Sequence, residues 1–545
     1  MHNKSLDRIN INYPFIMQNA SVSKKSQTTE TFKDNESVSL NKTLAGRKLQ
    51  VAEILEKLGE FGRFHYKTLI VCILASIAIS TSNAALPFLM KEPTFMCKDQ
   101  DGNLYECNQE KACVNPTGYQ LDYSIHSLVI EHRLYCDRRW IREWGQSLLF
   151  ILSSFLATFA MFSLERFGRR FIFNVVAVGT LACNILLFFF SNFWIIIIIL
   201  TFLWAFAYLY FTNFYVYSTE VFNGKWRSVA NSTFFVFNYS TKIIYILLNL
   251  MISTFYGNYI LMTVLGVLFL PLVYFLLETP YYYHRKGDVH ALKLNLQYIN
   301  KNNNFRQPEL VAENDKMIAH SLHIENLNEE ELHNVSAMEI NRKTQKSIFN
   351  EEFTRKSYII HMSLIIIAVI PNFIGGQLGE NIPYKLGINN IFISSVLFVT
   401  IIIIANFILM FYLHKIPRKK GNIIVVLILI SFSVIFVLFA VLGIQHKKSI
   451  KLIGLVITLL STGLGMAQFL LISRYVNEVF PTKIRANSIA FVLQIGRMSM
   501  FLVNVIDPLS EKVDVHPFAF LGVLYICSLP CFWRFEETLN KPTKN

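Results

Sequence analysis

The sequence has few charged residues, because Asp, Glu, Lys and Arg make up only 16% of its 545 residues. Soluble globular domains carry about 25% of these residues. Hydrophobic residues make up 53% of the chain instead. This composition excludes an ordinary soluble domain and favours a protein that lies in a lipid bilayer.

Motifs for catalysis and metal binding are also missing. The chain has no glycine-rich phosphate-binding loop, no His-Glu-x-x-His pattern and no nucleophile beside a recognisable base. We therefore expect no enzyme activity, no catalytic residue, no metal and no cofactor. The net charge of +14 indicates membrane orientation and contact with anionic lipid in so apolar a chain, and no nucleic-acid partner is expected.

Long apolar runs with almost no charge recur along the chain. The run NFWIIIIILTFLWAFAYLYF around Ile196 is about 20 residues long, which is enough to cross the hydrocarbon core as a helix. The sequence predicts twelve such helices and therefore an all-α, multi-pass membrane protein. Their predicted ranges are 65–90, 144–163, 171–190, 193–216, 229–250, 257–277, 358–378, 389–413, 422–443, 452–473, 486–506 and 516–533.

The distribution of Lys and Arg predicts how these helices are oriented. If both termini are cytosolic, the loops LERFGRRF, EVFNGKWR, HKIPRKKG and EVFPTKIR are cytosolic too, and each carries several basic residues. The positive-inside rule favours this orientation. Three lysines between His446 and Lys451 are an exception on the opposite side.

The domain organisation is predicted from the same segments. Residues 1–45 are polar and lack the apolar core of a signal peptide, so we expect a disordered cytosolic tail. The other predicted parts are an N-terminal six-helix bundle at 46–283 with an outer loop at 91–143, cytosolic linker helices at 284–357, a C-terminal six-helix bundle at 358–534 and a cytosolic tail at 535–545.

The segment before the first predicted span has helical periodicity. Leu49, Ala52, Leu55, Leu58 and Phe61 fall on one helical face. The segment is either an amphipathic helix at the inner membrane surface or an extension of the first span. The sequence leaves both interpretations open.

Four of the eight cysteines lie in the predicted outer loop. An even number of cysteines in an oxidising compartment predicts two disulfides, for which three pairings are possible. Free thiols or a metal site are the alternatives. The four residues are Cys97, Cys107, Cys113 and Cys136.

One charged segment occurs twice. The segments YSTEVFNGKWR and YVNEVFPTKIR begin 258 residues apart, at positions 217 and 475. Glu220 precedes Glu278 by 58 residues, and Glu478 precedes Glu536 by the same 58. A repeat of two six-helix halves is typical of a transporter whose substrate site lies near the membrane midplane between the halves.

Charged residues near the predicted cytosolic helix ends would act as a latch if Arg and Glu side chains pair when that side is closed. Exposed pairs contribute about 0–1 kcal/mol each, so several are needed to bias an equilibrium between two states. Alternatively, these residues only anchor helix ends at the lipid headgroups. The predicted latch residues are Glu165, Arg166, Gly168, Arg169, Arg170, Glu220, Arg227, Glu278, Glu478, Arg485 and Glu536.

Taken in order, these motifs resemble the organic ion transporter family of the major facilitator superfamily. They include EILEKLGEFGRF, ERFGRR, STEVFNGKWR, LETPYYYHRKGD, NEVFPTKIR and FEETLNK, which cover about residues 50–540. The resemblance implies a plasma-membrane carrier of organic cations, anions or carnitine. The chain departs from the family pattern at Glu165 and Pro417, and most clearly at Thr201, where relatives have Arg.

Arg497 is the main indication of the substrate's charge. It lies twelve residues beyond Arg485, which places it about 18 Å into a core about 30 Å thick. A buried Arg there is expected to face a wet cavity or a partner, and Gln494 and Asn504 share its helical face. No Asp or Glu lies well inside the twelve predicted spans, so the cavity is expected to favour a carboxylate. The family resemblance agrees, because anion and carnitine carriers have Arg at the position of Arg497.

Lys242 is either a second cation in the cavity or a side chain that reaches the outer headgroups. Other polar and aromatic residues at plausible depths are expected to line the cavity, although each fits a helix-packing contact equally well. The predicted substrate-binding residues are Arg497, Gln494, Lys242, Asn238, Tyr245, Asn372, Phe373 and Asn406.

The sequence therefore predicts a transmembrane transporter that carries a small organic anion or zwitterion by alternating access, through exchange or facilitated diffusion. An organic cation transporter of the same fold is the first alternative. A membrane sensor or scaffold that no longer transports is the second.

Overall fold

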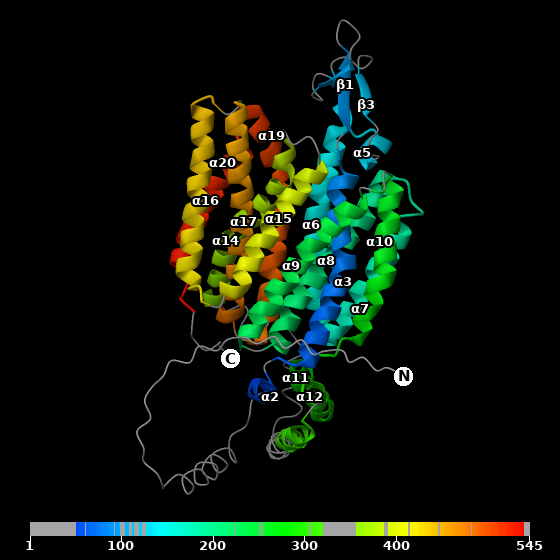
Figure 1. Cartoon of the computed structure of the whole chain (residues 1–545), viewed down its shortest axis with the longest axis vertical. Helices are drawn as coiled ribbons and strands as arrows, with labels where there is room; N and C mark the ends of the chain where they lie inside the picture. The colour runs from blue at the N-terminus through cyan, green and yellow to red at the C-terminus, as the bar shows by residue number, and fades with distance from the viewer. Residues whose placement is uncertain are drawn as a thin grey trace, which may run out of the picture. The chain divides into compact units, whose positions relative to one another are not determined.

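Twelve apolar helical segments correspond to the twelve predicted spans in the described part of the chain, and they occur in the predicted order (Figure 1). Ten of them are long and apolar enough to cross a bilayer, and the other two are α9 and α20. The predicted all-helical membrane fold is therefore confirmed. The computed structural model describes residues 51–59, 61–91, 93–98, 104–107, 112–113, 119–122, 127–222, 224–249, 251, 254–304, 307–319, 356–385, 391–412, 415–444, 447–480 and 482–538.

The twelve segments fall into two sets of six. The N-terminal six are α3 (Arg63–Leu89), α6 (Arg139–Leu164), α7 (Arg169–Leu186), α8 (Phe193–Val221), α9 (Gly224–Asn249) and α10 (Phe255–Phe269) with its 3₁₀ extension η3 (Leu270–Phe275). The C-terminal six are α14 (Lys356–Lys385), α15 (Ile391–Tyr412), α16 (Arg418–Val441), α17 (Lys448–Val479), the broken helix α18 (Thr482–Met498), η4 (Ser499–Leu502) and α19 (Val503–Val513), and α20 (Pro517–Trp533).

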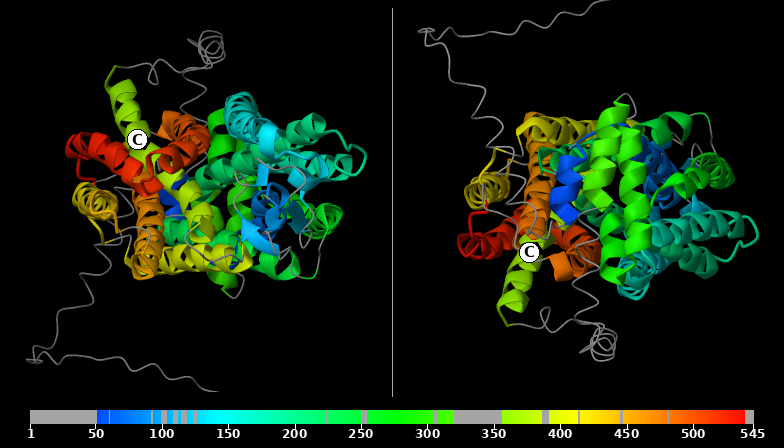
Figure 2. Two further views of the ribbon diagram at one scale, coloured as in Figure 1. Left: turned by 90° about the horizontal axis from the view of Figure 1, so that it is seen from above. Right: turned by 90° about the horizontal axis from the view of Figure 1, so that it is seen from below.

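The two sets repeat one packing pattern. The contact of α6 with α8 corresponds to that of α15 with α17. The contact of α3 with α9 corresponds to that of α14 with α18. The contact of α7 with α10 corresponds to that of α16 with α20. Viewed along the helices, the two sets lie largely on opposite sides (Figure 2). Contacts of α9 with α15 and of α6 with α18 join them. The internal repeat is thus present in the helix packing.

Helices differ in how much of their surface the protein covers. The apolar window of α8 is 78% buried, whereas that of α16 is 22% buried. The exposed side chains of α16 are large and apolar, including Ile424, Leu427 and Leu438. Such a surface fits contact with lipid, so α8 is a central helix and α16 a peripheral one.

Short helices cover one end of these twelve segments. α2 (Val51–Lys57), α11 (Pro280–Lys286) and α12 (Val289–Asn303) lie at the end opposite to the strands (Figure 1). α2 is separate from α3 and contacts α11, with Ile54 and Leu58 each 1% exposed. It is therefore not an extension of the first span, and protein covers its described side chains Ile54, Leu55 and Leu58. The predicted domain boundaries stay predictions, and residues 1–45, 320–355 and 539–545 lie outside the described residues.

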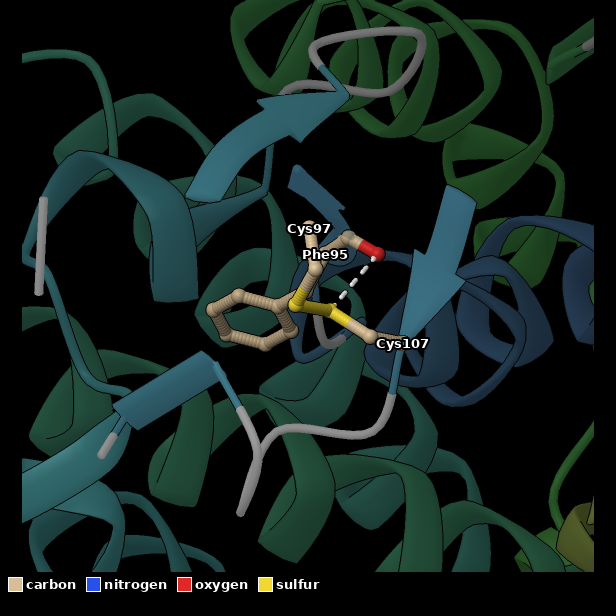
Figure 3. The surroundings of a disulfide bond; sticks show 3 residues. All are labelled: Phe95, Cys97 and Cys107. Carbon is tan, nitrogen blue, oxygen red and sulfur yellow. Dashed lines mark hydrogen bonds between the residues drawn. A yellow bond between two sulfur atoms is a disulfide. The ribbon is translucent and has the colours of Figure 1, made fainter. Parts of the chain in front are cut away.

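The loop between α3 and α6 forms a small sheet held by disulfides. β1 (Thr94–Lys98) pairs antiparallel with both β2 (Leu104–Cys107) and β3 (Tyr119–Asp122). Cys97 is bonded to Cys107, where the Cys107 sulfur lies 3.6 Å from the carbonyl oxygen of Phe95 (Figure 3). Cys113 is bonded to Cys136. The two predicted disulfides are confirmed, and consecutive cysteines pair.

Candidate functional site

Charged residues form a network at the end that carries α11, which we call the ion-pair end. Arg169 Nη2 lies 3.2 Å from Glu220 Oε1, and Thr279 Oγ1 donates to Glu220 Oε2 at 2.6 Å. Glu278 accepts the backbone N–H groups of Arg169 and Arg170 at 2.9 and 3.0 Å. These N–H groups begin α7, so Glu278 satisfies donors that a helix leaves unpaired at its N-terminus.

Gly168 lies directly before α7 with φ +100°, and a Cβ atom there would lie 2.3 Å from Glu278 Oε2. Any other residue would strain the backbone and displace the capping carboxylate. Burial raises the pKa of the Glu278 carboxyl group, although the N–H donors oppose this shift. The glycine of the ERFGRR motif is therefore required by the close approach of Glu278.

The C-terminal half repeats this network. Arg418 Nη2 lies 2.9 Å from Glu478 Oε1, and Thr538 Oγ1 donates to Glu478 Oε2 at 2.5 Å. Glu537 accepts the N–H groups of Arg418 and Lys419 at 2.8 and 3.2 Å. Both halves thus combine an Arg, a pairing Glu, a Thr and a second Glu that caps a helix.

The observed register differs by one residue from the predicted one. Glu537, and not Glu536, is the counterpart of Glu278, and the N–H group of Glu536 donates to the Tyr475 hydroxyl at 3.1 Å. The Glu-Thr dipeptide occurs at both capping positions and would have indicated this alignment. Arg418 was missed for a related reason, because Pro417 replaces the glycine that precedes Arg169.

Arg227 and Arg485 do not form the expected pairs with the repeated Glu residues in the described structure. Arg227 Nε donates to the Phe222 carbonyl at 3.3 Å, and Arg485 Nε donates to the Phe480 carbonyl at 3.2 Å. Each arginine therefore binds the C-terminal end of the preceding helix, as basic groups commonly do. Burial and the nearby Arg227 lower the pKa of Arg485 to about 10.

The remaining predicted latch residues lie around the N-terminal network. Arg170 also donates to the Tyr274 carbonyl at 3.0 Å. Arg166 lies over the Phe167 ring, 5.0 Å from its centre. Glu165 begins the 3₁₀ turn η2 (Glu165–Phe167), but its side chain lies outside the described structure.

Arg497 lies between the two halves. It is 7% exposed, and its Nη1 donates to the Tyr208 carbonyl at 3.2 Å and to Thr212 Oγ1 at 3.4 Å. Gln494 Nε2 donates to the same Thr212 hydroxyl at 2.9 Å. Tyr208 and Thr212 belong to α8, so α18 places two polar side chains against the central helix of the other half. No carboxylate pairs with Arg497 within 4 Å in the described part of the chain.

Aromatic rings of both halves contact Arg497 or its neighbour Gly496. Arg497 lies over the rings of Tyr208 and Phe211, 4.6 and 5.9 Å from their centres. On the other side, Phe373 contacts Phe469 edge-to-face at 5.1 Å. A Cβ atom on Gly496 would lie 2.6 Å from the Phe373 ring, so that ring packs directly beside the chain segment that carries Arg497.

The helix that carries Arg497 is interrupted one residue later. α18 ends at Met498, the 3₁₀ turn η4 follows, and α19 begins at Val503. Interrupted membrane helices commonly mark substrate sites and hinges. The predicted span at 486–506 is therefore present, at 487–510, with a 3₁₀ segment inside it, and Arg497 lies two residues before that segment.

Lys242 pairs with an acid, which neither of its two predicted interpretations included, and its place in the cavity lining stays a prediction. Its Nζ lies 3.0 Å from Glu380 Oε1 on α14, and the two side chains retain 17% and 10% of their exposure. Glu380 lies two residues beyond the predicted seventh span, so it was not among the residues expected inside the membrane. The cavity was expected to hold positive charge with no acid beside it. That expectation is wrong at Lys242, which pairs with Glu380. It agrees with the described surroundings of Arg497.

The other predicted substrate-binding residues are not gathered around Arg497 by the bonds they make. Asn238 accepts a hydrogen bond from Ser80, and the Tyr245 hydroxyl donates to Asn258, both within the N-terminal half. The amides of Asn372 and Asn406 donate to carbonyl groups one turn earlier in their own helices. Their roles in binding stay predictions.

A family model described as the Major Facilitator Superfamily matches residues 68–503. The chain belongs to the Major Facilitator Superfamily. Members of this family are transporters and not enzymes, so the expected multi-pass transporter is confirmed at this level. The chain is also 26% identical over 510 residues to a protein of Arabidopsis thaliana named organic cation/carnitine transporter 4, and this match covers 91% of the chain and 90% of the relative.

Solved structures of the same superfamily share the fold. The proton:xylose symporter XylE bound to 6-bromo-6-deoxy-D-glucose matches with a TM-score of 0.57 and 14% identity, over 88% of this chain and 97% of that one. A partially occluded, inward-open structure of XylE from E. coli gives a TM-score of 0.56 and 14% identity, over 88% and 99%. At this identity the similarity supports the fold alone.

Proposed function

We propose that this superfamily member transports small organic zwitterions that carry a carboxylate and a substituted ammonium group. The observation that carries this proposal is the environment of Arg497, which is buried, lies between the halves and binds only neutral oxygen atoms in the described structure. A guanidinium group donates two parallel hydrogen bonds to a carboxylate, which are stronger than those to neutral acceptors. A substrate carboxylate therefore binds Arg497 in preference to the Tyr208 carbonyl.

The surrounding rings suit the cationic part of such a substrate. Alkylated ammonium groups bind to the faces of Tyr, Trp and Phe rings. The Tyr208 ring already has the Arg497 cation over its face at 4.6 Å, and Phe373 and Phe469 lie on the opposite half. Once a carboxylate draws the guanidinium group away, the ring face becomes free for the substrate's ammonium group.

The name of the Arabidopsis relative supports the organic cation alternative better than the organic anion interpretation. A zwitterion accounts for both that name and Arg497, because it offers a cation to the rings and a carboxylate to the guanidinium group. A carrier of simple cations is the second candidate, since Glu380 supplies an acid between the halves. A simple cation leaves Arg497 without an anionic partner and is repelled by it.

The mechanism that we propose is alternating access. In the orientation predicted by the basic loops, the ion-pair end faces the cytosol and the disulfides face outside, and the plasma membrane is the expected location. The Arg169–Glu220 and Arg418–Glu478 networks then hold the cytosolic helix ends of each half together. The Arg474 side chain donates to Ser228 across the halves, which closes the cytosolic end of the seam.

Flux measurements with three matched solutes test the proposal. The purified chain in proteoliposomes receives labelled carnitine, choline, which has the ammonium group but no carboxylate, or butyrate, which has the carboxylate alone. We expect carnitine to enter fastest. Choline flux equal to carnitine flux would support the cation alternative, and binding without flux would support a sensor.

A further inference from the structure

The pair formed by Lys242 and Glu380 joins the two halves of the chain. Lys242 lies on α9, and Glu380 lies on α14 at a distance of 3.0 Å. Lys242 Nζ also lies 5.6 Å from the centre of the Phe398 ring on α15. Thus one lysine of the N-terminal half has an anion and an aromatic face of the C-terminal half as partners.

This pair lies toward the end that carries the disulfide-linked sheet, which we call the disulfide end. Lys242 is residue 19 of the 26 in α9, which begins at the ion-pair end. Other contacts between the halves accompany it. Asn504 Nδ2 donates to Ser147 Oγ at 2.8 Å, and the Phe88 and Phe392 ring centres lie 5.3 Å apart. In the described residues, the contacts that close the seam at this end include this ion pair, the bonds that Asn504 Nδ2 donates to Ser147 Oγ and to the Glu143 carbonyl oxygen, and the contact of Phe88 with Phe392.

Opening of the disulfide end must separate Lys242 from both Glu380 and Phe398. A largely buried charge that loses its partner is destabilised until water or a ligand replaces that partner. The pair therefore favours the closed state. Separation also leaves a cation on the wall formed by α9 and an anion on the wall formed by α14.

We propose that Lys242 and Glu380 form a gate at the disulfide end that selects zwitterions. A zwitterion replaces both partners at once, because its carboxylate meets Lys242 and its ammonium group meets Glu380. A simple cation pairs with Glu380 alone and is repelled by Lys242. A simple anion pairs with Lys242 alone and is repelled by Glu380. This selection rests on the proposed function, whereas the gate itself does not.

Two pairs of substitutions separate the gate from its ligand. Lys242→Met with Glu380→Gln removes both charges and leaves no unpaired ion. Lys242→Glu with Glu380→Lys reverses the pair and keeps its attraction. The control is Arg139→Gln with Glu143→Gln, which removes an ion pair of 2.7 Å between two side chains of the same helix, α6.

The first readout is the accessibility of the seam. A Ser147→Cys reporter in a Cys527→Ser background, which lacks the Asn504–Ser147 hydroxyl bond in every variant alike, is labelled with a charged maleimide in lipid nanodiscs, where both faces are reachable. We expect labelling of the charge-free pair to rise about fivefold, with wild-type rates in the reversed pair and the control. A wild-type labelling rate in the charge-free pair overturns the gate.

The second readout is the ratio of carnitine to choline uptake in proteoliposomes. We expect the charge-free pair to lower this ratio about tenfold, and the reversed pair to restore it. An unchanged ratio with raised labelling overturns the selection of zwitterions. If the chain moves no organic ion at all, the proposed function fails, and the labelling result still decides whether the gate exists.

Discussion

Glu278 and Glu537 occupy equivalent positions in the two halves of the chain. Each carboxylate accepts the first two N–H groups of a membrane helix, α7 for Glu278 and α16 for Glu537, at 2.8–3.2 Å. Each is followed by a Thr whose hydroxyl binds the Glu that pairs with the first Arg of that helix. The duplicated segments at positions 217 and 475 thus encode one network built twice.

The register of this network predicts different effects for two neighbouring glutamates. We expect Glu537→Gln to lower the free energy of unfolding by about 1–2 kcal/mol, because α16 loses a charged cap at its N-terminus. Glu536→Gln is expected to have a smaller effect, because the N–H groups that begin α16 donate to Glu537 and the bond of Glu536 to Tyr475 comes from its backbone. Thermal unfolding of both purified variants measures this. A larger loss for Glu536→Gln would contradict the observed register.

Gly168 gives a second prediction at the same end. Gly168→Ala combines strain at φ +100° with a Cβ atom 2.3 Å from Glu278 Oε2, so we expect a loss of about 1–3 kcal/mol or more. Gly287→Ala is the matched control, because Gly287 also has positive φ, +73°, but open space around it. The melting temperature of Gly287→Ala reports backbone strain alone. That of Gly168→Ala reports backbone strain together with the collision between the new Cβ atom and Glu278. Equal losses of stability in the two variants would show that the Glu278 side chain moves aside at no cost in free energy.

Gly496 gives a third prediction beside the proposed substrate site. A Cβ atom there would lie 2.6 Å from the Phe373 ring and 2.7 Å from Val369. We expect Gly496→Ala to force α18 from α14, with a loss of about 1–3 kcal/mol and reduced carnitine uptake. Gly376→Ala, whose nearest contact is Met466 Sδ at 3.6 Å, is the control and should keep wild-type uptake. Unimpaired uptake and stability in Gly496→Ala would refute this tight approach.

The helices were predictable because apolar runs of membrane length are a strong signal. The break after Met498 was not, since the residues of η4 are as apolar as their neighbours. The ion pair of Lys242 was missed because Glu380 lies two residues outside the predicted span, and helix ends are the least certain feature of such predictions. Cysteine pairing depends on the β1 and β2 register, which spacing alone does not determine.

Arg497 was predictable because a basic residue deep in a membrane helix is rare and usually functional. Its neighbours Tyr208 and Thr212 were not predicted as partners of Arg497, because they belong to the other half of the chain. One hydroxyl group among many apolar residues is also a weak indication of a binding site. The role of Tyr245 in binding stays a prediction. Its face was expected to line the site, yet its hydroxyl binds Asn258 within the N-terminal half.

Arg497 is proposed to bind the carboxylate of a zwitterion. The most direct measurement is the uptake KM of Arg497→Gln for carnitine and for choline, with Arg497→Lys as the charge-conserving variant. Loss of one charged hydrogen-bonding partner predicts a rise in the carnitine KM of about 10–100-fold and little change for choline, with partial recovery in Arg497→Lys. An unchanged carnitine KM in Arg497→Gln, or an equal rise for both solutes, would show that Arg497 does not bind the carboxylate.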